Sequence, residues 1–558
     1  MRAHQLRASI PILALVLTAA CGGSRRDTDA TVEVPAGGLA PLPPAAAADG
    51  ADFATGERCA QCHGAAGGVI RDRAGRDVSP VTTYATSMMS WAARDPYWLA
   101  VWSGERAAHP AGVAVVDDLC TRCHAPMGAR ELAHAGAAID FATVTTDPGA
   151  AGQLAREGVG CTTCHQIAPE GLGTPATYDG AFATTTGRQL AGPHASPFPM
   201  PMQRHVNFTP VEGAHVTQSE LCASCHTVIT QPLDAAGQPI GPEVNEQTTY
   251  LEWRASGLAR AGVTCQACHA PTTDVEGAPI VAKLSPMPPW LEPRQPIGRH
   301  TFLGANAYML GLLADNQPWT GSPVDPATLR AGAEAAIAMG QTAATLTIVD
   351  ATAVAGRVQA AIRVTNLTGH KLPTGYPGRR MWLHVRVLDA AGAVVFESGG
   401  VDAAGHLIDG AGARLDPPGA LLPHRDRVSA AGEVALWEAV QVDRTGAPTH
   451  ALLEAWAMGK DDRLLPQGWD PSAPEAGRTI AVGAADDVDF APGSDVVHVD
   501  VAAPGAARLV VELAFQSVPP AAIEAVGALR TAAAATFAAM ATRQPPTPIV
   551  LASTQVAL

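Results

Sequence analysis

Ten of the eleven cysteines fall into five copies of one pattern, Cys-x-x-Cys-His. The copies are Cys59, Cys62 and His63; Cys120, Cys123 and His124; Cys161, Cys164 and His165; Cys222, Cys225 and His226; and Cys265, Cys268 and His269. Two thiols three positions apart can bond to the two vinyl groups of one haem, and the adjacent histidine can bind its iron. The pattern therefore predicts that the cofactors are five covalently attached haem c groups.

Three other uses of paired cysteines fit the pattern less well. Disulfides form in exported proteins, but they give no reason for a histidine after every second cysteine. Zinc ribbons do not require that histidine either, and five half-sites would leave one without a partner. A thioredoxin-like redox motif occurs once near a βαβ unit rather than five times. Haem attachment is favoured over all three.

The spacing of the motifs indicates an internal repeat. Successive first cysteines lie 61, 41, 61 and 43 residues apart. The sequences DDLCTRCH and REGVGCTTCH around the second and third motifs match SELCASCH and ARAGVTCQACH around the fourth and fifth. This predicts a duplicated two-haem unit, with the two haems of each unit in a similar relative placement.

Two kinds of element are expected to position these groups. Apolar residues at helical offsets before the fifth motif (249–258), and similar periodicity after the first, predict helices joined by Gly/Pro loops. From about residue 340 the pattern alternates, with a hairpin expected over 381–396 and another strand over 509–515. The predicted fold class is α+β, a mainly helical, loop-rich multihaem domain followed by an antiparallel β-sandwich-like domain.

The chain start and these patterns together predict five segments. Residues 1–20 read as a signal peptide, because a basic start precedes an apolar run too short to span a membrane. Cys21 follows small residues, as at a bacterial lipoprotein cleavage site, so lipidation of Cys21 and a flexible linker over 21–50 are expected. The pentahaem domain is predicted over 51–335, the β-rich domain over 340–520, and a C-terminal helix and tail over 521–558.

The net charge of the chain limits the classes of partner that it is expected to bind. A net charge of −15 argues against nucleic acid, which needs clustered Lys and Arg. The expected partners are redox proteins acting as electron donor and acceptor, the membrane through Cys21, or a larger cytochrome complex. The expected location is the periplasm or the outer membrane.

Several segments between about residues 55 and 400 resemble multihaem cytochromes of the tetrahaem cytochrome c-554 type, related to hydroxylamine oxidoreductase. The segments are SMMSWAARDPYW, GPHASPFPMPMQRHVNFTP, GRHTFLGANAYML and NLTGHKLPTGYPGRR. The resemblance implies distal iron ligands at Met89, where the family has histidine, at His205 with His194 as second choice, at His300 and at His370. It does not assign these ligands to individual haems.

One further distal ligand is expected at His109, just upstream of the second motif, with His134 and His215 as weaker candidates. An electron carrier fills both axial positions of its irons, whereas an enzyme leaves one open. Ligand candidates outnumber irons, and the chain has no Cys-x-x-Cys-Lys, so electron transfer is favoured and no catalytic residue is predicted. The alternative is an oxidoreductase that acts on a small nitrogen or sulfur compound at a five-coordinate haem.

Overall fold

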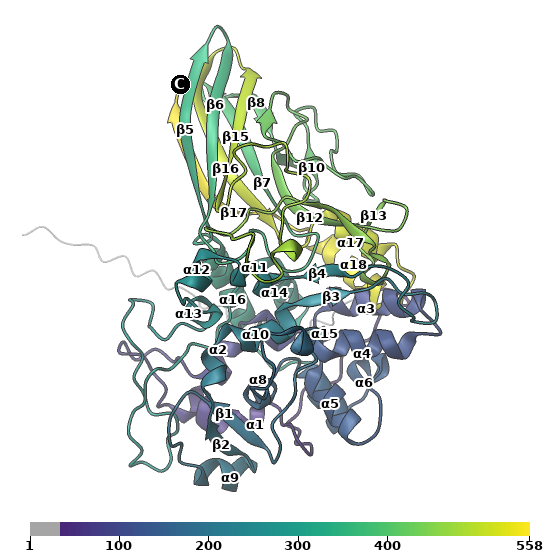
Figure 1. Cartoon of the computed structure of the whole chain (residues 1–558), viewed down its shortest axis with the longest axis vertical. Coiled ribbons are helices and arrows are strands. Elements are labelled where there is room, and N and C mark those ends of the chain that lie inside the picture. The colour runs from purple at the N-terminus through teal and green to yellow at the C-terminus, as the bar shows by residue number, and fades with distance from the viewer. Residues whose placement is uncertain (1–33) are drawn as a thin grey trace, which may run out of the picture.

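The computed structural model describes residues 34–558, which have an α+β architecture (Figure 1). Helices dominate the N-terminal half and strands the C-terminal part, as predicted from the sequence. The predicted signal peptide, Cys21 and the first part of the 21–50 linker lie outside the described residues. Within the described residues, every helix is too short or too polar to cross a bilayer.

The helical half consists of short helices. They are α1 (Glu57–His63), α2 (Pro80–Tyr84), α3 (Pro96–Ala108), α4 (Val113–His124), α5 (Pro126–His134), α6 (Phe141–Thr145), α7 (Ala150–Arg156), α8 (Cys161–Gln166), α9 (Met200–Val206), α10 (Ser219–His226), α11 (Thr249–Arg254), α12 (Gly257–Arg260), α13 (Cys265–His269), α14 (Ala307–Asp315), α15 (Gln317–Thr320) and α16 (Pro326–Gly340). Proline in the first turn starts α3 and α16, and the side chains of Asp95 and Asp325 cap them. Sequence signals therefore set these two helix starts.

Two small two-stranded sheets lie within the helical half and the larger sheets follow it. The strands are β1 (Gln189–Gly192), β2 (Thr209–Glu212), β3 (Val228–Thr230), β4 (Val244–Gln247), β5 (Ala344–Val354), β6 (Arg357–Asn366), β7 (Arg380–Asp389), β8 (Val394–Ser398), β9 (Gly400–Val401), β10 (Leu407–Ile408), β11 (Arg427–Val428), β12 (Leu436–Val442), β13 (Pro448–Thr449), β14 (Ala457–Asp461), β15 (Ser494–Ala502), β16 (Ala506–Gln516) and β17 (Ile549–Ala557). One sheet has the order β11-β15-β6-β5, and the other β13-β12-β7-β16-β17 with β14 on β12 and β8 on β7.

The two large sheets share one apolar core, so the C-terminal part is sandwich-like. Alternate residues of β6 and β15 from one sheet and of β7 and β16 from the other are buried together. The predicted hairpin is confirmed, because β7 and β8 pair antiparallel with Val387 opposite Phe396. The sandwich is not wholly antiparallel, since the short β11 joins β15 in parallel.

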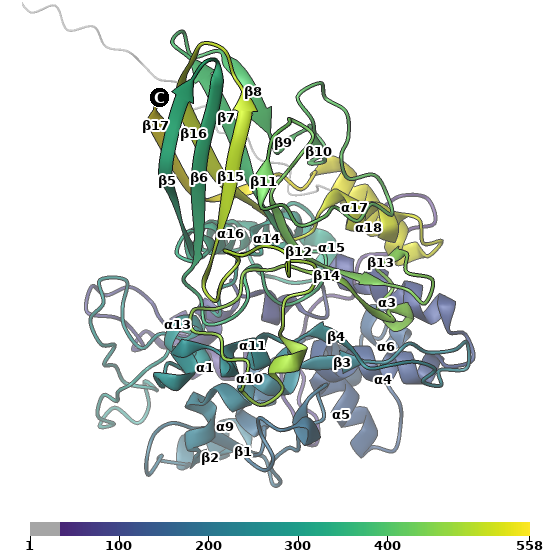
Figure 2. The ribbon, with the colours of Figure 1, turned by 45° about the horizontal axis from the view of Figure 1, so that its top comes forward.

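The end of the chain differs from the single helix and tail expected over 521–558. Two helices form, α17 (Pro520–Gly527) and α18 (Ala532–Arg543), because the Thr531 side chain caps a new start. Residues 549–557 then form β17, which pairs with β16 and places Leu551 in the sandwich core. Figure 2 shows α17 and α18 near α3, and Phe537 packs 5.2 Å from Tyr97.

A core substitution measures how far the sandwich depends on this packing. Leu513→Ala removes a fully buried side chain from β16, opposite Leu383 of β7. We expect the free energy of unfolding to fall by about 2–5 kcal/mol. Chemical denaturation checks this, with Val394→Ala, a half-exposed valine of β8, as the control. Equal losses in the two variants would contradict the assignment of the core.

Candidate haem-binding centre

All five cysteine motifs lie on helices. They occupy α1, α4, α8, α10 and α13, and the motif histidine is the last or next-to-last residue of each helix. Positions i, i+3 and i+4 share one face of a helix, so each motif presents two thiols and an imidazole to the same side. All ten motif cysteines are free thiols. This geometry suits thioether attachment and iron binding at one haem per motif.

The structure also bears on the other uses of cysteine. No disulfide joins any pair of the ten cysteines, all of which fall in the described part of the chain. Three groups of side chains in that part are close enough to share a metal ion, and none contains a cysteine. The motifs therefore do not assemble into zinc sites or a disulfide framework.

Two motif histidines face a second histidine at the distance that one iron requires. The ring centroids of His165 and His300 are 6.3 Å apart with planes at 24°, and those of His269 and His370 are 6.5 Å apart at 22°. Two metal–nitrogen bonds of about 2 Å, plus half a ring at each end, give roughly 6–6.5 Å. The structure thus places His300 opposite the third motif and His370 opposite the fifth.

Backbone carbonyls fix the orientation of these imidazoles. Nδ1 lies 2.5 Å from Ala191 O in His165, 2.8 Å from Leu303 O in His269, 2.9 Å from Gly298 O in His300 and 2.8 Å from Lys371 O in His370. A carbonyl oxygen only accepts hydrogen bonds, so Nδ1 carries the proton and Nε2 keeps its lone pair. Iron-binding histidines need this arrangement.

Burial favours the neutral form of all five motif histidines and of His300 and His370. It lowers the pKa of His63, His124, His226 and His300 to about 4, and the pKa values of His165, His269 and His370 also fall because of burial. Only a neutral imidazole can bind a metal. Nine of the ten motif cysteines are nevertheless only half-buried, and Cys268 is exposed.

Contacts between thiols connect the five motifs. Cys59 is adjacent to Cys161, Cys123 to Cys225, and Cys222 to Cys265, close enough for each pair to shift its pKa values. Cys164 of the third motif is also close enough to Cys225 of the fourth to have its pKa raised by it. The first motif therefore touches the third, the third lies near the fourth, and the fourth touches the second and the fifth.

This arrangement differs from the predicted duplication. If the second and third motifs repeated the fourth and fifth in space, the contact of Cys222 with Cys265 would have its counterpart between Cys120 and Cys161. Its counterpart is instead the contact of Cys59 with Cys161, between the first and third motifs. The local sequences are similar because each motif needs the same helix, but the loops between them set the placement.

The second motif has a different environment. Its histidine, His124, stacks on Trp98 with centroids 4.7 Å apart and planes at 4°, and no histidine ring in residues 34–558 stacks opposite it. The hydroxyls of Tyr97 and Tyr376 lie 3.2 Å apart nearby, on the interior face of α3. The carboxyls of Glu105 and Glu246 act on the Cys120 thiol and raise its pKa further after burial has raised it. Two carboxyl groups thus lie near the Cys120 thiol, while an indole ring packs against the motif histidine.

The remaining predicted iron ligands differ in burial and in the groups they contact. Met89 is half-buried, and its carbonyl accepts from Val159 N at 3.4 Å, two residues before the third motif. His109 is buried, with Nδ1 2.9 Å from Glu105 O. His205 is exposed, and its carbonyl lies 3.5 Å from the Arg58 guanidinium, beside the first motif. No ring of His109 or His205 stacks opposite a motif histidine in the described residues as His300 and His370 do, and the ligand roles of His109, His205 and Met89 stay predictions.

The second-choice histidines are placed less favourably. His134 is exposed and forms an ion pair with Asp52 at 2.8 Å. His194 is half-buried, and burial lowers its pKa. His215 uses Nε2 to donate to Ile167 O at 2.9 Å, which removes the nitrogen that the paired histidines leave available.

Three residues of this centre were not predicted from the sequence. Tyr84 is near Cys161, Cys164 and Cys225, so it lies between the third and fourth motifs, and burial raises its pKa. Tyr376 and Glu246 reach the second motif from segments far along the chain. Tyr84 belongs to the aromatic segment before α3, which is a local signal in the sequence. The positions of Tyr376 and Glu246 depend on tertiary packing and have no such signal.

The buried carboxyl of Glu105 predicts a pH dependence of stability. Burial raises its pKa from 4.5 to about 7, and Leu452 N donates to it at 2.7 Å. The folded state therefore holds this proton more tightly than the unfolded state, so its stabilising contribution is complete below pH 4.5 and is lost as the pH rises towards about 7. We expect Glu105→Gln to lose less stability than wild type between pH 5 and pH 8 in denaturant titrations. The exposed Glu292→Gln is the control, and a Glu105→Gln profile identical to wild type would refute the assignment.

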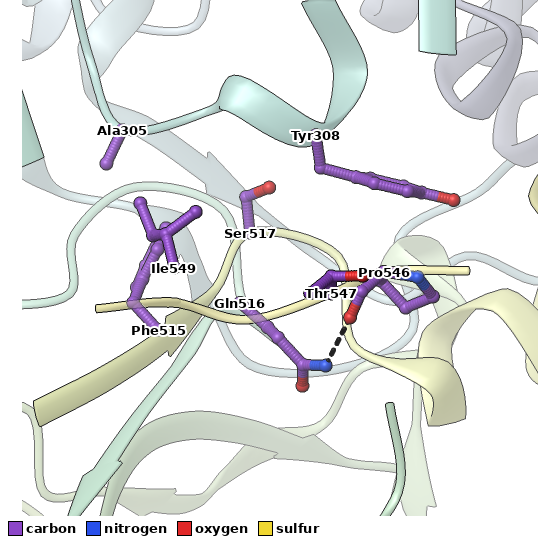
Figure 3. Close-up of a pocket in the computed structure, with 8 residues that line it drawn as sticks. All are labelled: Ala305, Tyr308, Phe515, Gln516, Ser517, Pro546, Thr547 and Ile549. Carbon is purple, nitrogen blue, oxygen red and sulfur yellow. Dashed lines mark hydrogen bonds between the residues drawn. The ribbon is translucent and has the colours of Figure 1, made fainter. Parts of the chain in front are cut away.

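One further cavity lies where α14 meets the ends of β16 and β17. Its lining includes Tyr308, Gln516 and Ser517, and Gln516 Nε2 donates to Pro546 O at 2.6 Å (Figure 3). With a volume of about 10 Å³ it is at the lower limit for one water molecule. It is a packing feature of this junction.

Comparison with known proteins gives one likeness. No family model matches the chain, and no curated protein is similar to it. Among solved structures, the chain is similar to a penta-heme cytochrome c552 from Thermochromatium tepidum, with a TM-score of 0.49 and 17% sequence identity over 90% of this chain and 98% of that chain.

Proposed function

We propose that the chain is a pentahaem c-type cytochrome that transfers electrons between redox partners outside the cytoplasm. The observation that carries this proposal is the connected set of five motifs, in which each motif lies against at least one other. When bound, haem c supplies one-electron iron chemistry. Neighbouring motifs would hold such groups close together, as transfer along an array requires.

The chain's own residues would then tune the array. His300 and His370 would hold the irons of the third and fifth sites together with His165 and His269, and backbone carbonyls hold the Nδ1 protons of His300 and His370. Filled axial positions favour transfer over binding of a substrate. Tyr84 lies near Cys161 and Cys164 of the third motif and Cys225 of the fourth, and would add a phenol group between these two sites.

Export and anchoring complete the proposal. Haem c is attached outside the cytoplasm, and the net charge of −15 suits redox partners that present a basic face. We expect the chain to be a lipoprotein of the periplasm or the outer membrane, held there by Cys21. Cys21→Ala is expected to move the haem-loaded protein from the membrane fraction to the soluble fraction, as followed by haem staining. Retention in the membrane fraction would refute the anchor.

Rapid-mixing spectroscopy tests the transfer function. Oxidised holoprotein is mixed with less than one equivalent of a one-electron donor, and the haem absorbance is followed. A connected array should bring the electrons to their equilibrium distribution, with most on the haems of highest potential, in one fast phase. A set of haems reduced only in a separate, far slower phase would refute the proposal.

A second candidate function rests on the second motif. His124 lacks an opposed imidazole, as do His63 and His226 in the described residues, but the second motif also has the carboxyls of Glu105 and Glu246 near its Cys120 thiol. Such a site suits an oxidoreductase that acts on a small nitrogen or sulfur compound at a five-coordinate haem. Electron paramagnetic resonance of the oxidised protein separates the two functions, because an open iron gives a high-spin signal that shifts when a small ligand is added.

A further inference from the structure

A buried group of histidine and carboxylate side chains lies in the β-rich part, away from the cysteine motifs. Asp495 belongs to β15, Asp462 directly follows β14, and His424 and Asp487 come from loops. The side chains are almost fully shielded from solvent, with 7% of His424, 2% of Asp487 and 0% of Asp462 exposed, and Asp495 is likewise 0% exposed.

Hydrogen bonds satisfy all but one of the buried carboxylates. His424 Nδ1 lies 3.0 Å from Asp462, which Lys460 also neutralises at 3.1 Å. His424 Nε2 lies 2.9 Å from Asp487 Oδ2. Asp495 Oδ2 accepts from Trp437 at 2.8 Å, but its buried Oδ1 has no hydrogen-bond partner. Leaving a buried carboxylate oxygen without a partner is costly, so this oxygen calls for a cationic ligand.

The geometry points to a site for a divalent metal ion at this position, and we propose that His424, Asp487 and Asp495 are its ligands. One ligand atom from each lies within 4.8 Å of the others. Asp462 would hold the Nδ1 proton of His424 and so direct Nε2 to the metal, as carboxylates do in many metal sites. One imidazole nitrogen with two carboxylate oxygens suits Zn²⁺ or Mn²⁺ rather than Ca²⁺, which takes oxygen ligands alone.

The metal would tie three separated segments together. Asp462 follows Asp461, whose carboxylate bonds Lys371 next to the paired His370. A bound ion at His424, Asp487 and Asp495 therefore stabilises the end of β14 that supports this region. A ligand that binds only the folded state raises the unfolding temperature, and the rise grows with the ratio of free ligand concentration to Kd.

Calorimetric titration of the haem-loaded protein tests the site. Protein stripped with a chelator is titrated at pH 8 with Zn²⁺, Mn²⁺ or Ca²⁺, and unfolding temperatures are measured with and without each ion. We expect one equivalent of Zn²⁺ or Mn²⁺ to bind and to raise the unfolding temperature. Asp495→Asn and His424→Gln should bind at least tenfold more weakly, whereas Asp486→Asn, at an exposed neighbouring carboxylate, should behave as wild type.

Each other outcome overturns the proposal. If wild type binds neither Zn²⁺ nor Mn²⁺, or binds only Ca²⁺, His424 is not a ligand and serves as an imidazolium between two carboxylates. Equal affinity in wild type and Asp495→Asn places the ion elsewhere. The wild-type unfolding temperature decides the matter even if a variant fails to fold, because no metal-dependent rise in wild type also refutes the site.

Discussion

Replacing His370 with alanine is expected to convert one haem of the oxidised protein from the low-spin to the high-spin form. His370 faces His269 with ring centroids 6.5 Å apart, so its removal would leave an iron held at the fifth motif with His269 as its one histidine ligand. The paramagnetic resonance spectrum should lose one low-spin species and gain a high-spin signal. His370→Met should keep the low-spin state but raise the potential of that haem by on the order of 100 mV, because thioether sulfur favours the reduced iron.

Two controls make this prediction specific. His300→Ala should produce the same change through the third motif, since His300 faces His165 at 6.3 Å. His134→Ala should leave every spin state unchanged, because His134 is exposed and paired with Asp52. An unaltered low-spin population in His370→Ala would contradict the ligand assignment.

Replacing Asp461 with alanine is expected to lower the free energy of unfolding by about 3–5 kcal/mol. Lys371 Nζ lies 2.7 Å from Asp461, and Arg463 contacts the same carboxylate at 2.7 Å. All three side chains are buried, so the substitution strands positive charge in the interior. Denaturant titration of the holoprotein measures the loss, and the signal of the fifth haem should report any loosening around His370.

A double variant and the pH dependence of stability provide two further tests of this prediction. Lys371→Met combined with Asp461→Leu removes the pair together and should recover most of the loss, while Arg463 keeps Glu252 at 3.2 Å. Burial disfavours the Asp461 carboxylate, but Arg463 and Lys371 outweigh it and lower its pKa to about 2. Its stabilising contribution is thus complete above pH 3.8 and is lost as the pH falls towards 2. A double variant as unstable as Asp461→Ala would contradict this account.

Local patterns predicted much of the fold. Alternating apolar residues predicted β7 and β16, and the turn over 389–392 predicted the β7–β8 hairpin. The final strand was missed because residues 549–557 follow a helix and gain their pairing only from β16, whose paired residues lie 34 to 49 positions earlier in the chain. The parallel contact of β11 is two residues long and leaves no periodic signal.

The candidate site likewise has local features that the sequence predicts and tertiary features that it does not. Each cysteine motif is a local feature, so residue types and spacing were enough to predict all five. The placement of His300 and His370 opposite particular motifs brings together residues 135 and 101 positions apart in the chain, so it could not be assigned beforehand. The similar sequences around the motifs also led to the prediction of a duplicated placement, which the thiol contacts do not show. The contact of Cys59 with Cys161 depends on the loops between the motifs and not on the motifs themselves.

The mass of the intact, denatured protein tests the central claim most directly. Thioether bonds survive denaturation, whereas bound metal ions and non-covalent cofactors are lost. We predict that the chain purified from its native host, or from a host that matures c-type cytochromes, carries the mass of five haems in addition to its own. A mass equal to the polypeptide alone, or with fewer than five haems in a fully matured sample, would contradict the account.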